Sequence, residues 1–491
     1  MRRLTLPAVV AALALVCTAC GKPAGTLEAA EETLGAASVK SIEFSGTGKW
    51  FQFGQAPNPA LPWPPFDVSS FKAAINYEVP SALVDMVRKQ TLEPPRVRPA
   101  PVEQHPIQAV SATSAWNLAV PPGAPASRAR VPQAQPGSVE ERTMEIWATP
   151  HGLLRAARAN NATSQPADGG TTVAVTVGGK RYVGTIDAQS HVVKVQTWID
   201  TPVLGDTPVE TTFSEYRDFG GVLFPARIVR TQGGHPVLDL TISNVKLNPS
   251  VDLPIPDQVK NAPPAPATVN VEKLAAGVYY LTGTNAHTIA IDQSDHIVAV
   301  EAPTNEARSL AVIAKIKETI PNKPIRYVVN SHVHFDHAGG LRTYVDEGAT
   351  VVTHQMNKPY FETAWAAPRT INPDQLARSR KEAKFQLVSD KHVLTDKNRN
   401  IEIHSIANSG HNDAFLMVYL PKEKILIEGD AFTPGPADAP PPAVPNPYSV
   451  NLNENIERLK LDVRQIAALH GPRVTTIADL RSAIGVKSKA N

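Results

Sequence analysis

The stretch that decides the fold reads Ser331-His332-Val333-His334-Phe335-Asp336-His337-Ala338-Gly339-Gly340, and it holds three of the 14 histidines in the chain. An apolar segment of buried-strand type, 325–329, precedes it, so the end of a strand delivers these residues to a loop. Side chains alternate along an extended backbone, and two histidines separated by one residue therefore point to the same side. The turn that follows lets Asp336 and His337 aim at an adjacent point. One short loop can therefore supply ligands to two metal ions.

Further ligands must come from outside this loop, because one loop cannot complete the coordination shells of two ions. Both cysteines of the chain, Cys17 and Cys20, belong to its first residues. We therefore exclude disulfides, cysteine nucleophiles and thiolate ligands from the folded part, so that any metal must be held by His, Asp or Glu. Three candidates stand beside glycine at the end of an expected strand or helix, where a side chain can face a cleft: His411, Asp430 and His470.

The order and approximate spacing of these residues resemble the metallo-β-lactamase superfamily, and the resemblance covers residues 269–491. It implies an α/β fold, the four-layered αββα sandwich, with a centre of two metal ions. By the resemblance, His332, His334 and His411 hold the first ion, Asp336, His337 and His470 hold the second, and Asp430 bridges them. We expect two Zn²⁺, because di-iron members of the superfamily usually carry Glu at the position of His334.

The activity that we expect is hydrolysis by a hydroxide that bridges the two metal ions, since zinc lowers the pKa of bound water to about 7. Asp336 would then act as a catalytic residue that orients this hydroxide or accepts its proton. The commonest zinc β-lactamases carry cysteine where Asp430 stands, which argues against antibiotic hydrolysis as the main activity. The scissile bond stays open among ester, lactone, thioester and β-lactam-like amide, because specificity lies in loops without a readable pattern.

Two other hypotheses stay open beside the zinc hydrolase. One is a mononuclear iron enzyme of the sulfur-oxidising kind on the same fold. The other is an envelope binding protein, whose N-terminal half holds a lipid or a partner while the metal domain is vestigial. The presence of acceptable ligands at all seven positions argues against the second of these.

The first half of the chain predicts a β-rich antiparallel domain of unknown function over residues 26–253. Segments such as 181–186 and 191–198 alternate or cluster β-branched residues, and Gly and Asp separate them at short intervals. Residues 93–135 are rich in Pro, Ala, Arg and Ser, which predicts either a long ordered loop or a flexible excursion from the domain. The proline-rich stretch 254–268 is interpreted as the linker to the metal domain.

The first 20 residues read as an export signal, with Arg2 and Arg3 before the apolar run 4–16. The residues around Cys20 resemble a bacterial lipoprotein processing site. The resemblance implies a lipidated Cys20 and a protein attached to the membrane on the periplasmic side of the cell envelope. Cleavage and release, which would give a secreted or soluble periplasmic protein, is the alternative.

The formal net charge of +2 falls to about zero when Arg2 and Arg3 are removed with the leader. This charge gives no indication of the basic surface that binds nucleic acid, so we expect a small-molecule substrate and no nucleic-acid partner. The sequence carries no pattern that indicates an oligomeric state.

Other histidines are interpreted as structural or incidental. His354 and His404 end expected strands, where either could line the cleft, but structural roles are favoured for both. His105, His151 and His235 have no partner pattern and are expected to face solvent or to be incidental. The proline-dense segment 434–447 lies between two predicted ligands. It is either a plain insertion or a cover over the mouth of the active site.

Overall fold

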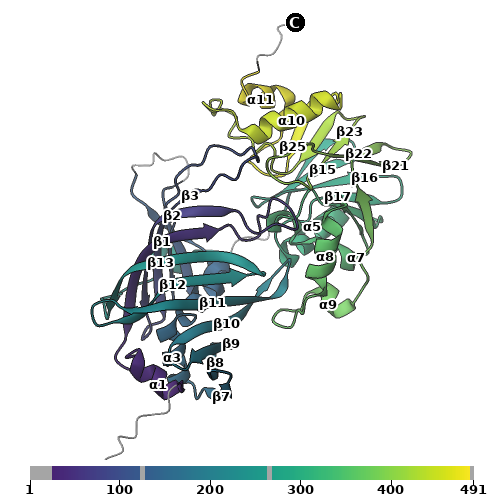
Figure 1. The fold of residues 1–491 in the computed structure, drawn as a ribbon. Helices are drawn as coiled ribbons and strands as arrows, with labels where there is room; N and C mark the ends of the chain where they lie inside the picture. Colours follow the sequence, from purple (N-terminus) through teal and green to yellow (C-terminus); the bar gives the residue numbers. More distant parts are fainter. Residues whose placement is uncertain (1–24, 122–127, 263–267, 487–491) are drawn as a thin grey trace, which may run out of the picture.

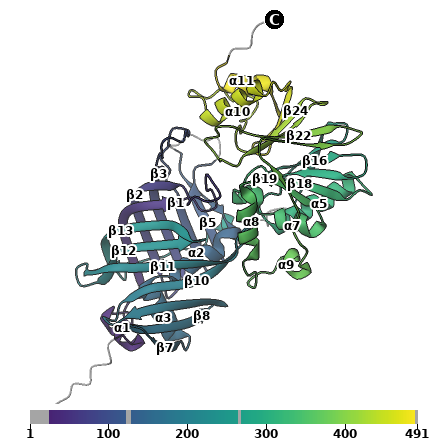
Figure 2. The same cartoon turned by 45° about the vertical axis from the view of Figure 1, so that its right-hand side comes forward.

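The computed structural model describes residues 25–121, 128–262 and 268–486. The predicted export leader, with Arg2, Arg3, Cys17 and Cys20, lies outside these residues. Within the described ranges, no helix is long and apolar enough to cross a bilayer. A β-rich unit and a mixed α/β unit stand side by side in Figures 1 and 2.

The β-rich unit is built on one sheet of 13 strands in the order β6-β5-β4-β3-β2-β1-β13-β12-β11-β10-β9-β8-β7. The strands are β1 (Ser41–Phe51), β2 (Pro65–Asn76), β3 (Ser81–Gln90), β4 (Ile107–Ser111), β5 (Ser114–Ala119), β6 (Val131–Ala134), β7 (Thr163–Ala167), β8 (Gly170–Val177), β9 (Lys180–Asp187), β10 (Val192–Thr201), β11 (Gly205–Asp218), β12 (Leu223–Gln232) and β13 (His235–Leu247). Two antiparallel runs meet where β1 pairs with β13. From Val195 to Thr201 every second residue is buried, which gives this sheet one apolar face. The predicted antiparallel β-rich unit is thereby confirmed.

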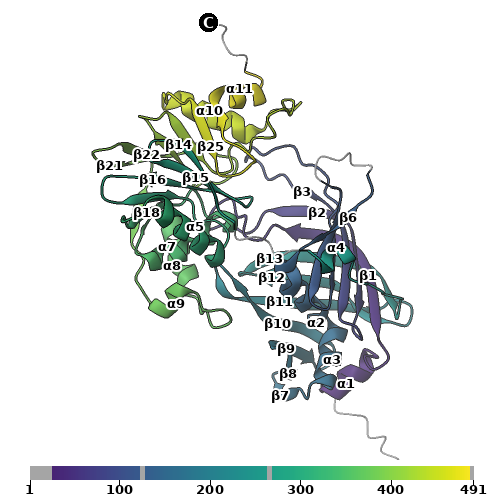
Figure 3. The ribbon, with the colours of Figure 1, turned by 180° about the vertical axis from the view of Figure 1, so that it is seen from behind.

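Helices cover the apolar face of this sheet, as the view from behind in Figure 3 shows. They are α1 (Leu27–Thr33), the 3-10 turn η1 (Pro136–Ser138), α2 (Val139–Trp147) and α3 (Pro150–Ala159). Helix α3 begins where the Thr149 hydroxyl accepts a hydrogen bond from the N–H of Gly152 at 3.1 Å. Its Leu153 and Leu154 then share one core with sheet residues such as Phe224.

His151 is part of that core, and the prediction that it faces solvent is wrong. Its side chain in α3 is fully buried, its Nε2 lies 3.0 Å from the carbonyl oxygen of Leu34, and its ring stacks on Phe224. Burial lowers its pKa to about 4, so the ring is neutral at pH 7. A lone histidine gives no sequence signal for this, because the residues that bury it, such as Phe224, are distant in the chain.

The predicted loop 93–135 is also wrong in part, because β4, β5 and β6 lie within it and extend the sheet beyond β3. In these strands the backbone N–H and C=O groups form hydrogen bonds, although the segment is rich in proline. The predicted linker 254–268 contains one short helix. Helix α4 (Asp257–Lys260) lies on β5 and β6, where Val259 packs with Trp116.

The second unit contains two sheets. The first, in the order β14-β15-β16-β17-β18-β19-β20, consists of β14 (Asn270–Ala275), β15 (Val278–Thr282), β16 (Thr288–Asp292), β17 (Ile297–Val300), β18 (Ile325–Val329), β19 (Thr350–His354) and β20 (Phe385–Val388). The second, in the order β21-β22-β23-β24-β25-β26, consists of β21 (Lys391–Thr395), β22 (Asn400–Ser405), β23 (Leu416–Leu420), β24 (Ile425–Glu428), β25 (Gln465–Ala468) and β26 (Thr475–Thr476).

Helices cover the outer face of each sheet. They are α5 (Glu306–Thr319), α6 (Phe335–Ala338), α7 (Leu341–Glu347), α8 (Asn357–Ala366), α9 (Gln375–Ser379), α10 (Pro447–Arg458) and α11 (Ile477–Ala483). One apolar cluster lies between the two sheets, another beneath α5, α7 and α8, and a third beneath α10 and α11. Strands such as β17 and β24 are buried on both sides, as continuous apolar runs predict. The expected αββα sandwich is confirmed.

Candidate metal centre

The deciding stretch leaves the end of β18 as a loop and then enters the short helix α6. His332 and His334 lie in the loop, and Asp336 and His337 lie on α6. The side chains of all three histidines are almost completely buried. The end of a buried strand in an α/β sheet is where ligand sites form, because neighbouring strands deliver their loops to the same edge.

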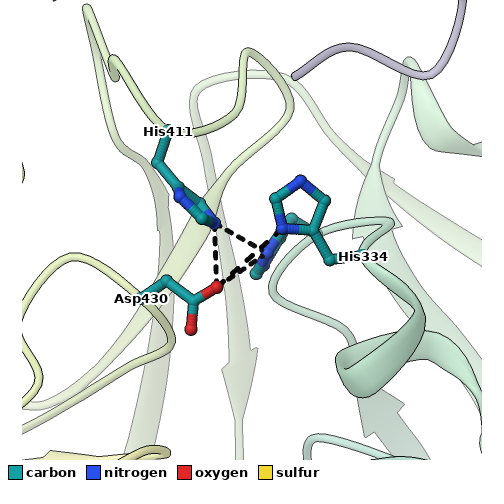
Figure 4. A group of neighbouring side chains, drawn as sticks. His334, His411 and Asp430 are labelled. Carbon is teal, nitrogen blue, oxygen red and sulfur yellow. Dashed lines mark hydrogen bonds and ion pairs between the residues drawn. The ribbon is translucent and has the colours of Figure 1, made fainter. Parts of the chain in front are cut away.

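The other three predicted ligands reach this edge from the second sheet. His411 lies in the loop between β22 and β23, Asp430 follows β24, and His470 follows β25. The structure brings all seven together as two groups, His332, His334, His411 and Asp430 in one and Asp336, His337, Asp430 and His470 in the other, with the ligand atoms of each group within 4.8 Å of one another. Figure 4 shows His334 and His411 turned toward Asp430.

Asp430 stands between the two groups and presents one oxygen to each. Its Oδ2 lies 2.8 Å from Nε2 of His411 and 3.4 Å from Nε2 of His332. Its Oδ1 lies 3.0 Å from Nε2 of His337 and 3.0 Å from Nε2 of His470. This geometry allows a single carboxylate to contact two cations.

Hydrogen bonds behind the first group fix which ring nitrogen carries the proton. The hydroxyl of Ser331 donates to Glu301, so its oxygen accepts from Nδ1–H of His332 at 2.9 Å. The Nε2–H of His334 donates to the carbonyl of Ala56 at 3.0 Å. The opposite nitrogens, Nε2 of His332 and Nδ1 of His334, are therefore left as lone-pair donors that face the centre. Among the described residues, Nδ1 of His334 is buried without a hydrogen-bond partner.

Hydrogen bonds also fix which ring nitrogen carries the proton in the second group. Nδ1–H of His337 donates to Glu301 at 2.9 Å, and Nδ1–H of His470 donates to the carbonyl of Asn285 at 2.6 Å. Their Nε2 atoms then face each other at 3.0 Å. Two lone pairs at that distance repel unless a cation or a proton lies between them.

This donor set fits a divalent cation in each group. Ligand atoms around a tetrahedral zinc ion with bonds of about 2.0–2.1 Å lie about 3.3 Å apart. The distances from the carboxylate oxygens of Asp430 to the Nε2 atoms of four histidines are 2.8 to 3.4 Å. Histidines whose outer nitrogens are held by carboxylate or carbonyl oxygens are the usual metal ligands in proteins.

Residues 303–467 match the family model of the metallo-beta-lactamase superfamily. The C-terminal half carries a metallo-β-lactamase superfamily domain. Its sequence resemblance is thereby confirmed, and membership of this superfamily suggests a metal-dependent hydrolase. The two side-chain groups fit a divalent metal site.

Solved structures of metallo-β-lactamases are similar to this domain. One from Pontibacter korlensis is 18% identical with a TM-score of 0.34, and covers 45% of this chain and 98% of its own. The FIM-1 enzyme of Pseudomonas aeruginosa in its mono-zinc form is 17% identical with a TM-score of 0.35, and covers 45% of this chain and 96% of its own. One from Hirschia baltica is 20% identical with a TM-score of 0.33, and covers 44% of this chain and 97% of its own. No curated protein matches the chain.

The charges of the metallo-β-lactamase domain favour cations at its centre. Burial opposes ionisation of Asp430, but the surrounding His337 and His411 hold the pKa of that carboxyl well below its usual range. Burial likewise opposes a charge on His470, yet its contacts with Asp336 and Asp430 raise the pKa of the ring to about 10. In the absence of metal the ionised carboxylates therefore hold a proton on His470, which a divalent cation would displace.

Sequence reasoning missed the residues that hold the ligands from behind. Glu301 is fully buried at the end of β17, where it accepts hydrogen bonds from Ser331 and His337. Its position at the carboxyl end of the strand beside β18 was a usable signal. Gln55 and Ala56 gave no signal, because they belong to the other unit.

The remaining histidines and the proline-dense segment lie outside the two groups. His404 contacts Glu402 at 2.9 Å within β22, and His354 accepts a hydrogen bond from the N–H of Met356. The segment 434–447 starts beside the centre, because Pro434 lies against Gly471, the neighbour of His470.

Proposed function

We propose that this chain is a binuclear metal-dependent hydrolase that uses two Zn²⁺ and acts on a small-molecule substrate. What supports the proposal is the position of Asp430, whose two oxygens face two separate sets of histidines at 2.8 to 3.4 Å. A centre for one ion would need only one of these sets. The nitrogen-rich donor set favours zinc over harder cations such as Mg²⁺.

Bound there, two divalent ions would supply a nucleophile by lowering the pKa of a shared water to about 7 and would stabilise the developing oxyanion. His332, His334 and His411 would hold one ion, and His337, His470 and Asp336 would hold the other. The side chain of Asp336 is 41% exposed, more than that of any other ligand. It therefore lies on the open side of the centre, where it can orient an attacking water or accept its proton.

The substrate class that we propose is an ester, lactone, thioester or β-lactam-like amide. An acyl bond of this kind has a carbonyl carbon for the nucleophile and needs no serine or cysteine. Asp430 replaces the cysteine of the commonest zinc β-lactamases, so β-lactams are the least favoured of these substrates.

The experiment joins metal analysis of the purified full chain to a hydrolysis screen with generic ester, lactone, thioester, phosphodiester and cephalosporin substrates. We expect two zinc equivalents and hydrolysis of an acyl bond. A His332→Ala/His334→Ala double variant should lose hydrolysis and the zinc equivalent of the first group, whereas His105→Ala, on the surface beside Asp85, should keep hydrolysis and both equivalents. One iron equivalent with oxygen consumption would instead establish a mononuclear iron enzyme. A chain that binds no metal would leave the envelope binding protein as the better hypothesis.

We also propose that the protein is exported and attached to the periplasmic side of a membrane through a lipidated Cys20. The supporting observation is the sequence around this cysteine, which resembles a lipoprotein processing site. Cell fractionation tests it: the protein should sediment with membranes, and Cys20→Ser should release it or leave it unprocessed. Recovery of the parent protein in the soluble periplasmic fraction would overturn lipid attachment.

A further inference from the structure

The loop between β1 and β2, residues 52–64, leaves the β-rich sheet and enters the metal centre of the other unit. Its backbone contacts residues that lie next to the ligands in the sequence. The carbonyl of Gly54 accepts from the N–H of Phe335 at 3.1 Å, and the carbonyl of Pro57 accepts from the N–H of Asp413 at 2.9 Å. These partners are sequence neighbours of the ligands on α6 and of His411.

Aromatic packing fixes this loop to both units. The ring of Phe335, which lies between two ligands in sequence, packs edge-on against Phe53 at 5.2 Å and Trp63 at 5.8 Å. Trp63 also donates its Nε1–H to the carbonyl of Gln232 in the β-rich sheet at 3.1 Å. The loop is therefore anchored to both units.

Two contacts of the loop reach metal ligands directly. The carbonyl of Ala56 accepts from Nε2–H of His334 at 3.0 Å and from the side-chain amide of Asn412 at 3.0 Å. The side-chain amide of Gln55 donates to Oδ1 of Asp336 at 2.9 Å. Oδ2 of Asp336 is left to face the second group, 3.4 Å from Nε2 of His470.

We propose that the β-rich unit completes the metal centre, with Gln55 as a positioning residue that orients Asp336 toward the second ion. Ala56 in turn positions His334. Its backbone carbonyl accepts from Nε2–H, which keeps the proton on Nε2 and directs Nδ1 of His334 toward the centre. The proposal rests on the proposed binuclear function. It assigns to the N-terminal half a part in metal binding.

The hydrogen bond from Gln55 to Asp336 does more than fill space beside the metal centre. An exposed aspartate side chain rotates freely, and fixing it in one orientation costs conformational entropy at the moment when metal binds. A hydrogen bond from a loop that is itself packed on two aromatic rings removes much of that cost beforehand. Loss of a residue that holds a ligand in this way typically lowers metal affinity or activity about 10–100-fold.

The test is a competition titration of the metal-depleted full chain with Zn²⁺ and a chromophoric chelator. His411→Ala and His470→Ala variants assign the two binding steps to the first and second groups. Gln55→Met keeps the approximate volume of the side chain but removes the donor. We expect it to weaken the second step about 10–100-fold and to leave the first step within about twofold. Gln55→Ala should give the same result.

Gln52→Met is the matched control, since Gln52 is a half-buried glutamine of the same loop. Within the described part of the chain its side chain makes no hydrogen bond, so both steps should match the parent. Absorption of the Co²⁺-loaded protein gives a second readout, because a changed position of Asp336 alters the ligand field of one ion only.

Two results would overturn the inference. In one, Gln55→Met binds both ions as the parent does. In the other, both steps weaken equally along with the stability of the fold, which would make Gln55 a packing residue. A parent protein that binds fewer than two ions would instead overturn the proposed function, and this inference with it.

Discussion

Replacing Glu301 with glutamine removes an acceptor from behind the metal centre while keeping the shape of the side chain. One carboxylate oxygen accepts from the hydroxyl of Ser331 and from Nδ1–H of His337 at 2.9 Å. The other accepts from the amide of Asn330 at 3.2 Å and from the backbone N–H of Ser331 at 3.3 Å. A glutamine side chain has one oxygen and one N–H₂ group. In either orientation, two of the four donors therefore face the N–H₂ group instead of an acceptor.

The magnitude follows from these contacts. A buried donor without an acceptor costs about 1–3 kcal/mol, which is the expected loss in the free energy of unfolding for Glu301→Gln. If the amide nitrogen faces His337, the ring avoids the conflict by moving its proton from Nδ1 to Nε2. Nε2 is then no longer a lone-pair donor, so metal affinity should fall about 10–100-fold, or about 1.4–2.7 kcal/mol.

The assay combines urea unfolding of the metal-depleted protein with chelator competition for Zn²⁺. Glu423→Gln is the control, because Glu423 is a buried carboxylate paired with Arg399 at 3.0 Å at the opposite end of β24 from Asp430. The control should lose stability without losing metal affinity. If Glu301→Gln binds Zn²⁺ within about twofold of the parent, the idea that hydrogen bonds from behind set the ligand nitrogens is refuted.

Two further predictions concern the other unit. Gly54→Ala places a Cβ 2.7 Å from the ring of Phe335 at a φ of +78°, whereas Gly234→Ala meets no described atom within 4 Å at a φ of +84°. Both should lose about 1 kcal/mol of stability to the left-handed backbone, but only Gly54→Ala should weaken Zn²⁺ binding; equal Zn²⁺ affinities would contradict this. His151, with its pKa lowered to about 4 in the fold, binds a proton more readily when unfolded, where its pKa is about 6.5. Its contribution to stability is therefore present above pH 6.5 and is lost as pH falls toward 4, by up to about 3 kcal/mol. Urea unfolding of the parent and of His151→Leu at pH 7 and pH 4.5 checks this, and equal pH dependence of the two proteins would contradict it.

The C-terminal fold could be predicted from the sequence because its signals are local. The strand 325–329 and the histidine-rich loop that follows it each have a spacing that indicates their structure. The candidate ligands His411 and Asp430 were recognisable for the same reason, since each follows or precedes an apolar strand beside glycine.

The rest depends on contacts between segments that are far apart in the chain. Strands β4 to β6 form because β3 offers an open edge, which their own composition does not reveal. Gln55 approaches Asp336 across 281 positions of sequence, and nothing in its own neighbourhood marks it as part of a metal centre. Ala56 acts through a backbone carbonyl, which every residue has.

The number of zinc ions bound by Asp430→Ala tests the shared carboxylate most directly. Elemental analysis after equilibrium dialysis against micromolar Zn²⁺ should find two equivalents in the parent and one in His411→Ala or His470→Ala. Because one carboxylate faces both groups of histidines, Asp430→Ala should bind less than one equivalent of zinc. Retention of both ions by Asp430→Ala, or a parent that never binds more than one, would contradict the paired centre.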